Sequence, residues 1–368
     1  MVNSPEQLDL RSKVGQLFLI GIAGPELDTA TRELIEDIRP GGVCLFARNI
    51  REAKQTRELL DGIREMSAIE PFLSLDQEGG LVDRLRRIMT PMPAANKIKT
   101  ADDARRHGNL IAEATRMLGF NTDFAPVVDV IDAKREKDNN GLYSRAFGSD
   151  ANKATELAGA FLSELQNGGI LGCIKHFPGL GAAAVDSHEE LPSVDIDDAE
   201  LETTDLLPYR KLIETSDPAF VMVAHAAFPH SKYQTKDTDG RNLPSSLNGE
   251  FLTNLLRNDL DFKGISITDD LEMGAILKNY GIGRACVLAV NAGEDMLAIC
   301  ADRDNIAAGR DAVIEAVASG EISIERIDEA VARIDKVRLL ISPPTEFNSK
   351  RLAELSDEIA EFNQHLNR

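Results

Sequence analysis

Side chains that could do chemistry stand repeatedly at the ends of short apolar runs in this sequence. Asp76 follows the run 72–75, and Asp269 follows the run 264–268. The other residues of this kind at such ends are Asp129, Lys175, His176 and His225. Any one of them could instead cap a helix or sit in a core, but five such ends at one rim favour a shared site. Together these groups can hydrogen-bond the hydroxyls of a polyol and transfer protons.

The densest cluster runs from Lys175 to His188 and reads Lys-His-Phe-Pro-Gly-Leu-Gly-Ala-Ala-Ala-Val-Asp-Ser-His. Its glycines and proline indicate a loop. Asp186 and His188 are two residues apart, so in an extended segment they point to the same side. The carboxylate can then hold the imidazole in one tautomer and raise its basicity. This spacing predicts a general acid/base dyad; the alternative is an Asp turn beside an incidental histidine.

The elements that position these residues alternate between two periodicities. Short β-rich apolar runs predict strands, and the longer segments between them have a helical period. We predict eight strands, at residues 17–22, 42–46, 72–75, 124–130, 170–175, 220–224, 264–268 and 296–299. Helices are predicted at 31–38, 56–66, 103–118, 154–166, 206–213, 251–260, 284–292 and 306–318.

Eight βα units close a barrel more readily than they fill an open sheet, so we predict an α/β fold of the (β/α)8 barrel type. Residues 1–341 would form this catalytic barrel. Residues 342–368 would form a C-terminal helical extension, with a helix at 350–365 that packs on the barrel exterior. Such barrels carry their active sites at the C-terminal ends of the strands, where the polar residues stand.

The charge balance restricts the partners. The chain has 368 residues, of which 61 are acidic and 41 basic, and its net charge is -20. This negative field would repel nucleic acid and anionic lipid surfaces, so neither is expected as a partner. No signal-like N-terminus and no membrane-spanning run is present, which predicts a cytoplasmic protein. The four cysteines lack metal or disulfide spacing and are expected to be reduced core thiols.

Several motifs together resemble glycoside hydrolase family 3, and within it the single-barrel bacterial β-N-acetylglucosaminidases. Three carry most of the resemblance: Lys-His-Phe-Pro-Gly at 175–179, Asp-Ser-His at 186–188 and Ile-Thr-Asp-Asp-Leu-Glu-Met at 267–273. The others are Asp-Gln-Glu-Gly-Gly at 76–80, Asp-Phe-Ala-Pro-Val-Val-Asp-Val at 123–130, Ser-Arg-Ala-Phe-Gly at 144–148 and Val-Met-Val-Ala-His at 221–225. Each is weak alone, but they run in family order over most of the chain.

The resemblance implies a retaining exo-enzyme that releases terminal N-acetylglucosamine from cell-wall muropeptide fragments, as in peptidoglycan recycling. Asp269 would be the nucleophile that forms a covalent glycosyl-enzyme. Asp186 and His188 would protonate the leaving oxygen and then deprotonate water, in place of the usual second carboxylate. The residues implied to hold the sugar are Asp76, Arg84, Arg145, Lys175 and His176, with His225 nearby in the same pocket.

One departure from the family pattern lies in the dyad loop. Relatives usually read Gly-His-Gly-Asp-Thr where this chain has Gly-Leu-Gly-Ala-Ala at 179–183. Three polar groups are therefore replaced, by Leu180, Ala182 and Ala183. If those groups only order the loop, the chemistry stays intact, and if they touch substrate, the specificity has changed. We favour the first interpretation because the dyad, Lys175 and His176 are retained.

Composition bears on the size of the substrate. Aromatic residues make up 5% of the chain and tryptophan is absent, whereas polysaccharide clefts use aromatic platforms. A small pocket for one terminal sugar is expected.

The alternatives to an N-acetylglucosaminidase are a phosphorylase, a β-glucosidase and a catalytically silent sugar-binding barrel. The histidines lack metal-ligand spacing, so we expect no bound metal. We also expect no cofactor, and we expect the protein to be a monomer.

Overall fold

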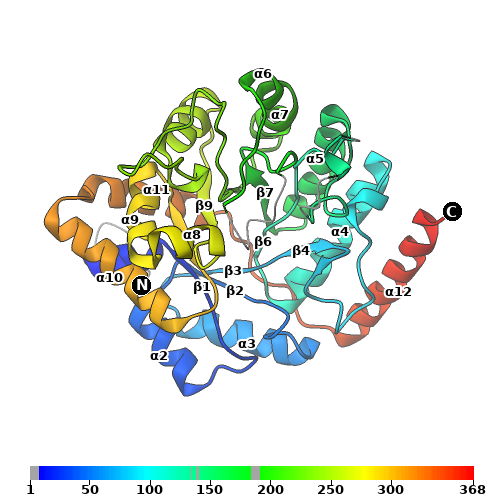
Figure 1. The fold of residues 1–368 in the computed structure, drawn as a ribbon. Helices are drawn as coiled ribbons and strands as arrows, with labels where there is room; N and C mark the ends of the chain where they lie inside the picture. Colours follow the sequence, from blue (N-terminus) through cyan, green and yellow to red (C-terminus); the bar gives the residue numbers. More distant parts are fainter. Residues whose placement is uncertain (1–7, 133, 138–140, 184–190) are drawn as a thin grey trace.

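The computed structural model describes residues 8–132, 134–137, 141–183 and 191–368. Parallel strands form a closed barrel, and helices surround it (Figure 1). In order around the barrel the eight strands are β1 (Phe18–Gly21), β10 (Met296–Ile299), β9 (Ile265–Asp270), β8 (Phe220–Val223), β7 (Leu171–Phe177), β6 (Thr122–Asp123), β3 (Phe72–Leu75) and β2 (Gly42–Cys44). Each barrel strand therefore lies beside its neighbours in chain order, and the predicted (β/α)8 barrel is confirmed.

The fourth barrel strand differs from the prediction. It is the short β6, and the predicted strand at 124–130 is wrong. Pro126 has no N–H to offer a ladder, which explains why regular pairing stops there. Beyond it the chain still runs beside β7, because Val128 N donates to Lys175 O at 2.8 Å. Asp129 consequently belongs to an irregular segment, not to the end of a strand.

The helices form where an amphipathic stretch has a suitable first residue. In α4 (Ala101–Leu118), Thr100 Oγ1 accepts from Asp103 N at 3.1 Å, a cap that stabilises such a helix by about 1 kcal/mol. The other predicted helices are α2 (Thr29–Ile38), α3 (Ala53–Met66), α5 (Ala151–Asn167), α7 (Leu206–Ser216), η6 (Glu250–Asp259), α9 (Ile282–Ala292) and α10 (Arg303–Ser319). Unpredicted helices include α1 (Leu10–Gln16), α8 (Gly274–Tyr280) and α11 (Ile324–Arg338).

A small hairpin stands outside the barrel ladder after β3. It consists of β4 (Gln77–Gly79) and β5 (Val82–Asp83), which pair antiparallel. Gly79 and Gly80 have φ of 91° and 60°, a conformation that side chains disfavour, so glycine permits the turn. This hairpin carries Glu78 and precedes Arg84, and it thereby brings part of the charged site into place.

The last helix, α12 (Ser349–Leu366), lies on the outside of the barrel against α4 (Figure 1). Its buried apolar face includes Leu355, Ile359 and Phe362. The helix predicted at 350–365 is therefore present, while the division of the chain at residue 341 stays a prediction. Among the described residues no helix combines the length and apolar character needed to cross a membrane.

Candidate active site

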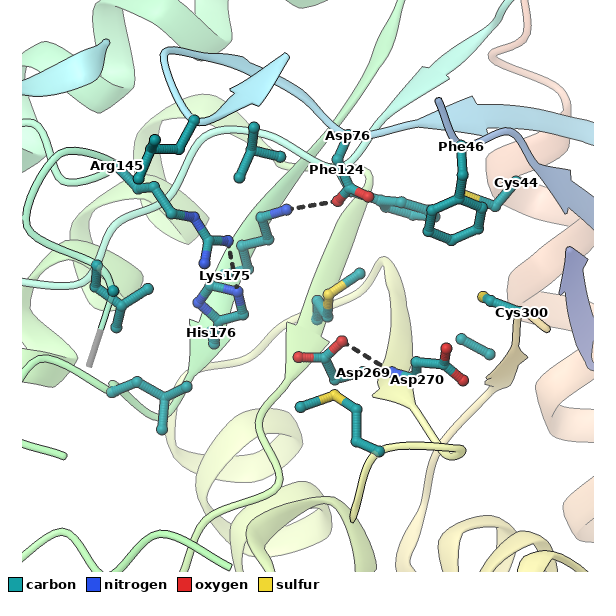
Figure 2. A pocket seen from close by; sticks show the side chains of 18 of the residues that line it. Cys44, Phe46, Asp76, Phe124, Arg145, Lys175, His176, Asp269, Asp270 and Cys300 are labelled. Atoms are coloured by element: carbon teal, nitrogen blue, oxygen red, sulfur yellow. Dashed lines mark hydrogen bonds and ion pairs between the residues drawn. The ribbon is translucent and has the colours of Figure 1, made fainter. Parts of the chain in front are cut away.

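A cavity of about 340 Å³ opens at the C-terminal end of the barrel strands. Six of the predicted site residues line it: Asp76, Arg84, Arg145, Lys175, His176 and Asp269. Figure 2 shows the side chains of Arg145, Lys175 and His176 on one side of the cavity and those of Cys44, Phe46 and Cys300 on the other, with Asp76 and Asp269 between them. The cavity thus has a charged wall opposite a less polar one.

A buried ionic cluster forms the charged wall. Lys175 Nζ lies 2.7 Å from Asp76 Oδ1 and 2.7 Å from Glu78 Oε1. Arg145 donates two hydrogen bonds to Glu78, at 2.8 and 2.9 Å. Arg84 donates to Asp76 at 3.2 Å. Removing one member would leave its partner charged and without compensation, which in buried pairs costs roughly 3 to 5 kcal/mol.

The cluster is ionised because its charges compensate one another. Burial opposes ionisation of Asp76, but Lys175 and Arg84 outweigh it and hold the pKa of this carboxyl well below its usual range. Burial is likewise outweighed at Glu78, where Arg145 and Lys175 lower the pKa to about 2. The pKa of Lys175 is raised although burial lowers it, because Asp76 and Glu78 favour the ammonium form. Hydroxyl groups in this cavity would therefore meet fixed charges of both signs.

His176 is oriented by a carboxylate behind it. Its Nδ1 lies 2.7 Å from Asp129 Oδ2, and its Nε2 lies 3.3 Å from a guanidinium nitrogen of Arg145. The contact of Nδ1 with a carboxylate fits a proton on Nδ1. Asp129 also accepts from Leu180 N at 2.7 Å. One carboxylate thus holds both a site histidine and the start of the loop that follows.

Asp269 is the penultimate residue of β9, and its carboxylate lines the cavity (Figure 2). Asp270 N donates to its Oδ1 at 2.8 Å. Burial raises the pKa of Asp269, but His176, His225 and this hydrogen bond outweigh burial and lower the pKa below its usual value. The side chain is therefore ionised at neutral pH, as a carboxylate nucleophile must be.

His225, which the resemblance implies to lie near the sugar, contacts the residues around Asp269 from a buried position. Its side chain is fully buried and is not among the described residues that line the cavity. Nδ1 lies 2.7 Å from Ser246 Oγ, and Nε2 lies 3.1 Å from Asp270 O. His225 therefore stands behind β9, where it contacts the backbone next to Asp269.

The two carboxylates that follow Asp269 differ in their surroundings. Burial, with Glu272 and Asp269 nearby, raises the pKa of Asp270 to about 7. Glu272 is occupied as a backbone acceptor, because Cys300 N, Ala301 N and Asp302 N donate to its two oxygens at 2.6 to 3.0 Å. Glu272 therefore anchors the end of β10, and its oxygens are not directed at a substrate.

The predicted dyad, Asp186 and His188, lies outside the described residues. The last residue described before it, Ala183, lines the cavity and pairs with Val194. Leu180 lines the cavity as well. Two of the positions that depart from the family pattern, 180 and 183, thus form part of the wall and replace polar groups with apolar ones.

Sequence reasoning did not assign Glu78, which is only 4% exposed and central to the cluster. Asp76 and Glu78 are two residues apart around the start of a strand, a spacing that could have indicated a shared side. All four cysteines are buried and unpaired, as predicted, but Cys44 and Cys300 also line the cavity.

No three His, Cys, Asp or Glu side chains within the described part of the chain converge as metal ligands would.

Comparisons with known proteins agree with this geometry. Residues 9–337 match the model of the glycosyl hydrolase family 3 N-terminal domain. A β-hexosaminidase of Pseudomonas aeruginosa is 32% identical over 340 residues, which are 91% of this chain and 90% of that protein. β-Hexosaminidase A of Pseudoalteromonas piscicida is 30% identical over 335 residues, which cover 85% of this chain but 55% of that relative, so the chain spans about half its length.

The fold is matched in a solved structure as well. A glycoside hydrolase family 3 β-N-acetylglucosaminidase from Paenibacillus sp. str. FPU-7 superposes with a TM-score of 0.87 and 32% identity. The match covers 96% of this chain and 69% of that one. The chain therefore belongs to glycosyl hydrolase family 3 and is a glycoside hydrolase.

Proposed function

We propose that this protein is a retaining exo-β-N-acetylglucosaminidase. It releases terminal N-acetylglucosamine from cell-wall muropeptide fragments, in the cytoplasm. The observation that carries the proposal is the ionised Asp269 in a cavity that Asp76, Lys175 and Arg145 also line. Glu78 binds both of these cations. An anionic nucleophile beside fixed hydrogen-bond donors and acceptors suits a bound sugar at its anomeric carbon.

The size of the cavity supports an exo-acting enzyme. Its volume of about 340 Å³ is at the small end of the usual range for ligand pockets. One sugar ring fits such a space, whereas a polymer requires an open cleft. The names of the relatives, β-hexosaminidases and a β-N-acetylglucosaminidase, support an N-acetylhexosamine in that position.

In the first step, an oxygen of Asp269 attacks the anomeric carbon and the bond from that carbon to the leaving oxygen breaks. His188 gives its proton to the leaving oxygen, and Asp186 keeps the imidazole oriented. In the second step, water attacks the same carbon, the bond to Asp269 breaks, and His188 takes a proton from the water. Two displacements at one carbon retain the anomeric configuration.

The sugar is held by charge-assisted hydrogen bonds. Lys175 and Arg145 donate from the buried cluster, and Asp76 accepts. Because Glu78 fixes these two donors and Asp129 fixes His176 before substrate arrives, little orientational freedom is lost on binding. This preorganisation places the anomeric carbon next to Asp269.

A chromogenic assay tests the proposal. The protein is incubated with 4-nitrophenyl N-acetyl-β-glucosaminide and, separately, with the corresponding β-glucoside, each with and without phosphate. We expect the N-acetylglucosaminide to be cleaved to free N-acetylglucosamine at a rate independent of phosphate. A sugar 1-phosphate would indicate a phosphorylase, preference for the glucoside a β-glucosidase, and absence of turnover with both sugars a silent barrel; each contradicts the proposal.

A second assay addresses the natural substrate. The products from a 1,6-anhydro-muropeptide carrying terminal N-acetylglucosamine are separated and identified by mass. Release of the terminal sugar, at a higher kcat/KM than from a chitin oligomer, is expected. A clear preference for the chitin oligomer would contradict the proposed substrate class.

A further inference from the structure

The C-terminal helix α12 is hydrogen-bonded to the loop at residues 90–94. Thr90 N donates to Ser356 Oγ at 2.8 Å, and the two hydroxyl oxygens are also 2.8 Å apart. About two helical turns after Ser356, Asn363 Nδ2 donates to Pro91 O at 2.9 Å. The family match ends at residue 337, so these contacts come from a segment beyond the matched region.

The other side of the same loop, residues 90–94, packs against the β4–β5 hairpin. Met92 N donates to Asp83 Oδ2 at 2.8 Å, and Gly80 N donates to Met92 O at 3.0 Å. The approach is close, because a Cβ built on Gly79 would lie 2.1 Å from Pro93 O. The loop therefore has no room to shift without moving the hairpin.

A buried histidine makes a second connection between α12 and the hairpin. His107 of α4 is fully buried, and neither ring nitrogen has a hydrogen-bond partner in the described structure. Its ring centroid lies 6.3 Å from that of Phe362 and 5.3 Å from that of Phe161. On the other side, Nε2 lies 3.1 Å from the position of a Cβ on Gly79. The imidazole thus serves as a packing spacer between Phe362 and the hairpin.

The hairpin in turn carries one of the charges that organise the cavity. Glu78 lies between Gln77 and Gly79 in β4, and its carboxylate holds both Arg145 and Lys175. No residue of α12 is among the described residues that line the cavity. The contacts of α12 with loop 90–94 and His107 connect it to the cavity through this hairpin.

We propose that α12 is a positioning element of the sugar site, which acts through loop 90–94 and His107 to keep Glu78 in place against Arg145 and Lys175. Ser356, Asn363 and Phe362 are its positioning residues. The inference rests on the proposed sugar-binding role of the Glu78 cluster. The competing view is that α12 stabilises the barrel without any influence on substrate binding.

The test compares two variants of the full chain. Ser356→Ala/Asn363→Ala removes the bonds from α12 to loop 90–94. The control, Lys350→Ala, removes the exposed pair of Lys350 Nζ with Glu354 Oε1 at 3.6 Å on α12 and leaves the contacts with loop 90–94 in place. Hydrogen–deuterium exchange of residues 77–94 and KM and kcat are measured for each, with the 4-nitrophenyl glycoside that the wild-type enzyme cleaves best.

The double variant is expected to exchange faster in residues 77–94, and its KM should rise about fivefold or more with a smaller change in kcat, because misplacement of binding groups weakens substrate positioning. Ser356→Thr/Asn363→Ala, which restores one hydroxyl, should recover part of the KM. The control should resemble wild type in both measurements. If the double variant has the KM of the control, the inference is overturned, whether or not the exchange rises.

Two outcomes, an unfolded double variant and an inactive wild type, are covered by further comparisons. If the double variant does not fold, Asn363→Ala alone is compared with Lys350→Ala by the same measurements. Failure of the wild type on N-acetylglucosaminide would count against the proposed function, and the KM comparison would then proceed with the glycoside that is cleaved. The two failures are therefore distinguishable.

Discussion

Glu78 Oε1 lies 2.7 Å from Lys175 Nζ while the same carboxylate takes two hydrogen bonds from Arg145, so one buried anion fixes two cations of the cavity wall. Asp76 alone cannot do this, because its oxygens contact Lys175 and Arg84. Glu78 therefore fixes the positions of Lys175 and Arg145, the proposed donors to the sugar, although no motif had assigned it a role.

Glu78→Gln should weaken substrate binding strongly. The amide removes the negative charge and replaces one acceptor oxygen with a donor, so Arg145 and Lys175 lose their compensation. We expect kcat/KM to fall about 10²-fold or more, which corresponds to roughly 3 kcal/mol. Steady-state kinetics checks this, with Glu58→Gln as the matched control, because Glu58 pairs with Lys54 on the exposed face of α3. An equal effect of the two substitutions would contradict the role of Glu78.

Lys175→Ala and Arg145→Ala should each lower the specificity constant. Each truncation removes a charge-assisted hydrogen bond worth on the order of 1.5 to 3 kcal/mol in transition-state binding. Measured with the chromogenic substrate, this amounts to a loss of at least about tenfold for each variant. If both variants keep the wild-type kcat/KM, the sugar binds elsewhere.

The barrel fold was predictable from the sequence because eight apolar runs and their intervening helical segments each carry a clear period. Local irregularity defeated the same reasoning at 124–130, where Pro126 interrupts the ladder. The strands of the β4–β5 hairpin are too short to show a hydrophobic period in the sequence. The position of the hairpin depends on contacts with residues 90–94, which no sequence pattern predicts. Asp269, Lys175 and His176 were found through motifs; Glu78 and the place of His225 required the three-dimensional structure.

Asp123→Asn should change how stability depends on pH. Asp123 is fully buried beneath the cluster, and burial raises its pKa to about 8 in the folded protein from an ordinary value of 3.8. The folded state thus holds this proton more tightly than the unfolded state, so the contribution of Asp123 to stability is full below pH 3.8 and is lost as pH rises toward 8. The asparagine does not ionise and still offers an oxygen to Gln77 N, which Asp123 Oδ1 accepts at 2.8 Å.

The free energy of unfolding, measured in urea at pH 5, 6, 7 and 8, checks this. Between pH 5 and 8 the wild type should lose stability relative to Asp123→Asn by up to about 1.4 kcal/mol per pH unit. Parallel curves for the two proteins would show that Asp123 does not titrate in this way.

His188→Ala should separate substrates by their leaving groups. A dinitrophenolate leaves without a proton, so the glycosyl-enzyme should form from such a substrate at a near-normal rate, whereas natural glycosides should lose roughly 10² to 10⁴ in rate. Asp186→Asn should give a milder form of the same pattern, because the orienting charge is lost and the proton carrier remains. Pre-steady-state kinetics measures the first step. Equal losses for both substrate classes would remove His188 from the acid/base role.

The central claim is that Asp269 is the covalent nucleophile, and trapping its adduct tests this most directly. His188→Ala, which should form the glycosyl-enzyme from a dinitrophenyl N-acetylglucosaminide and hydrolyse it slowly, is quenched in acid and its mass is measured before and after proteolysis. We predict one added N-acetylhexosaminyl group per chain, on the peptide that contains Asp269, and no adduct in Asp269→Ala/His188→Ala. The turnover of Asp269→Ala alone should be lower than that of the wild type by about three or more orders of magnitude. An adduct on Asp270 or another residue, or near-normal turnover in Asp269→Ala, would contradict the assignment.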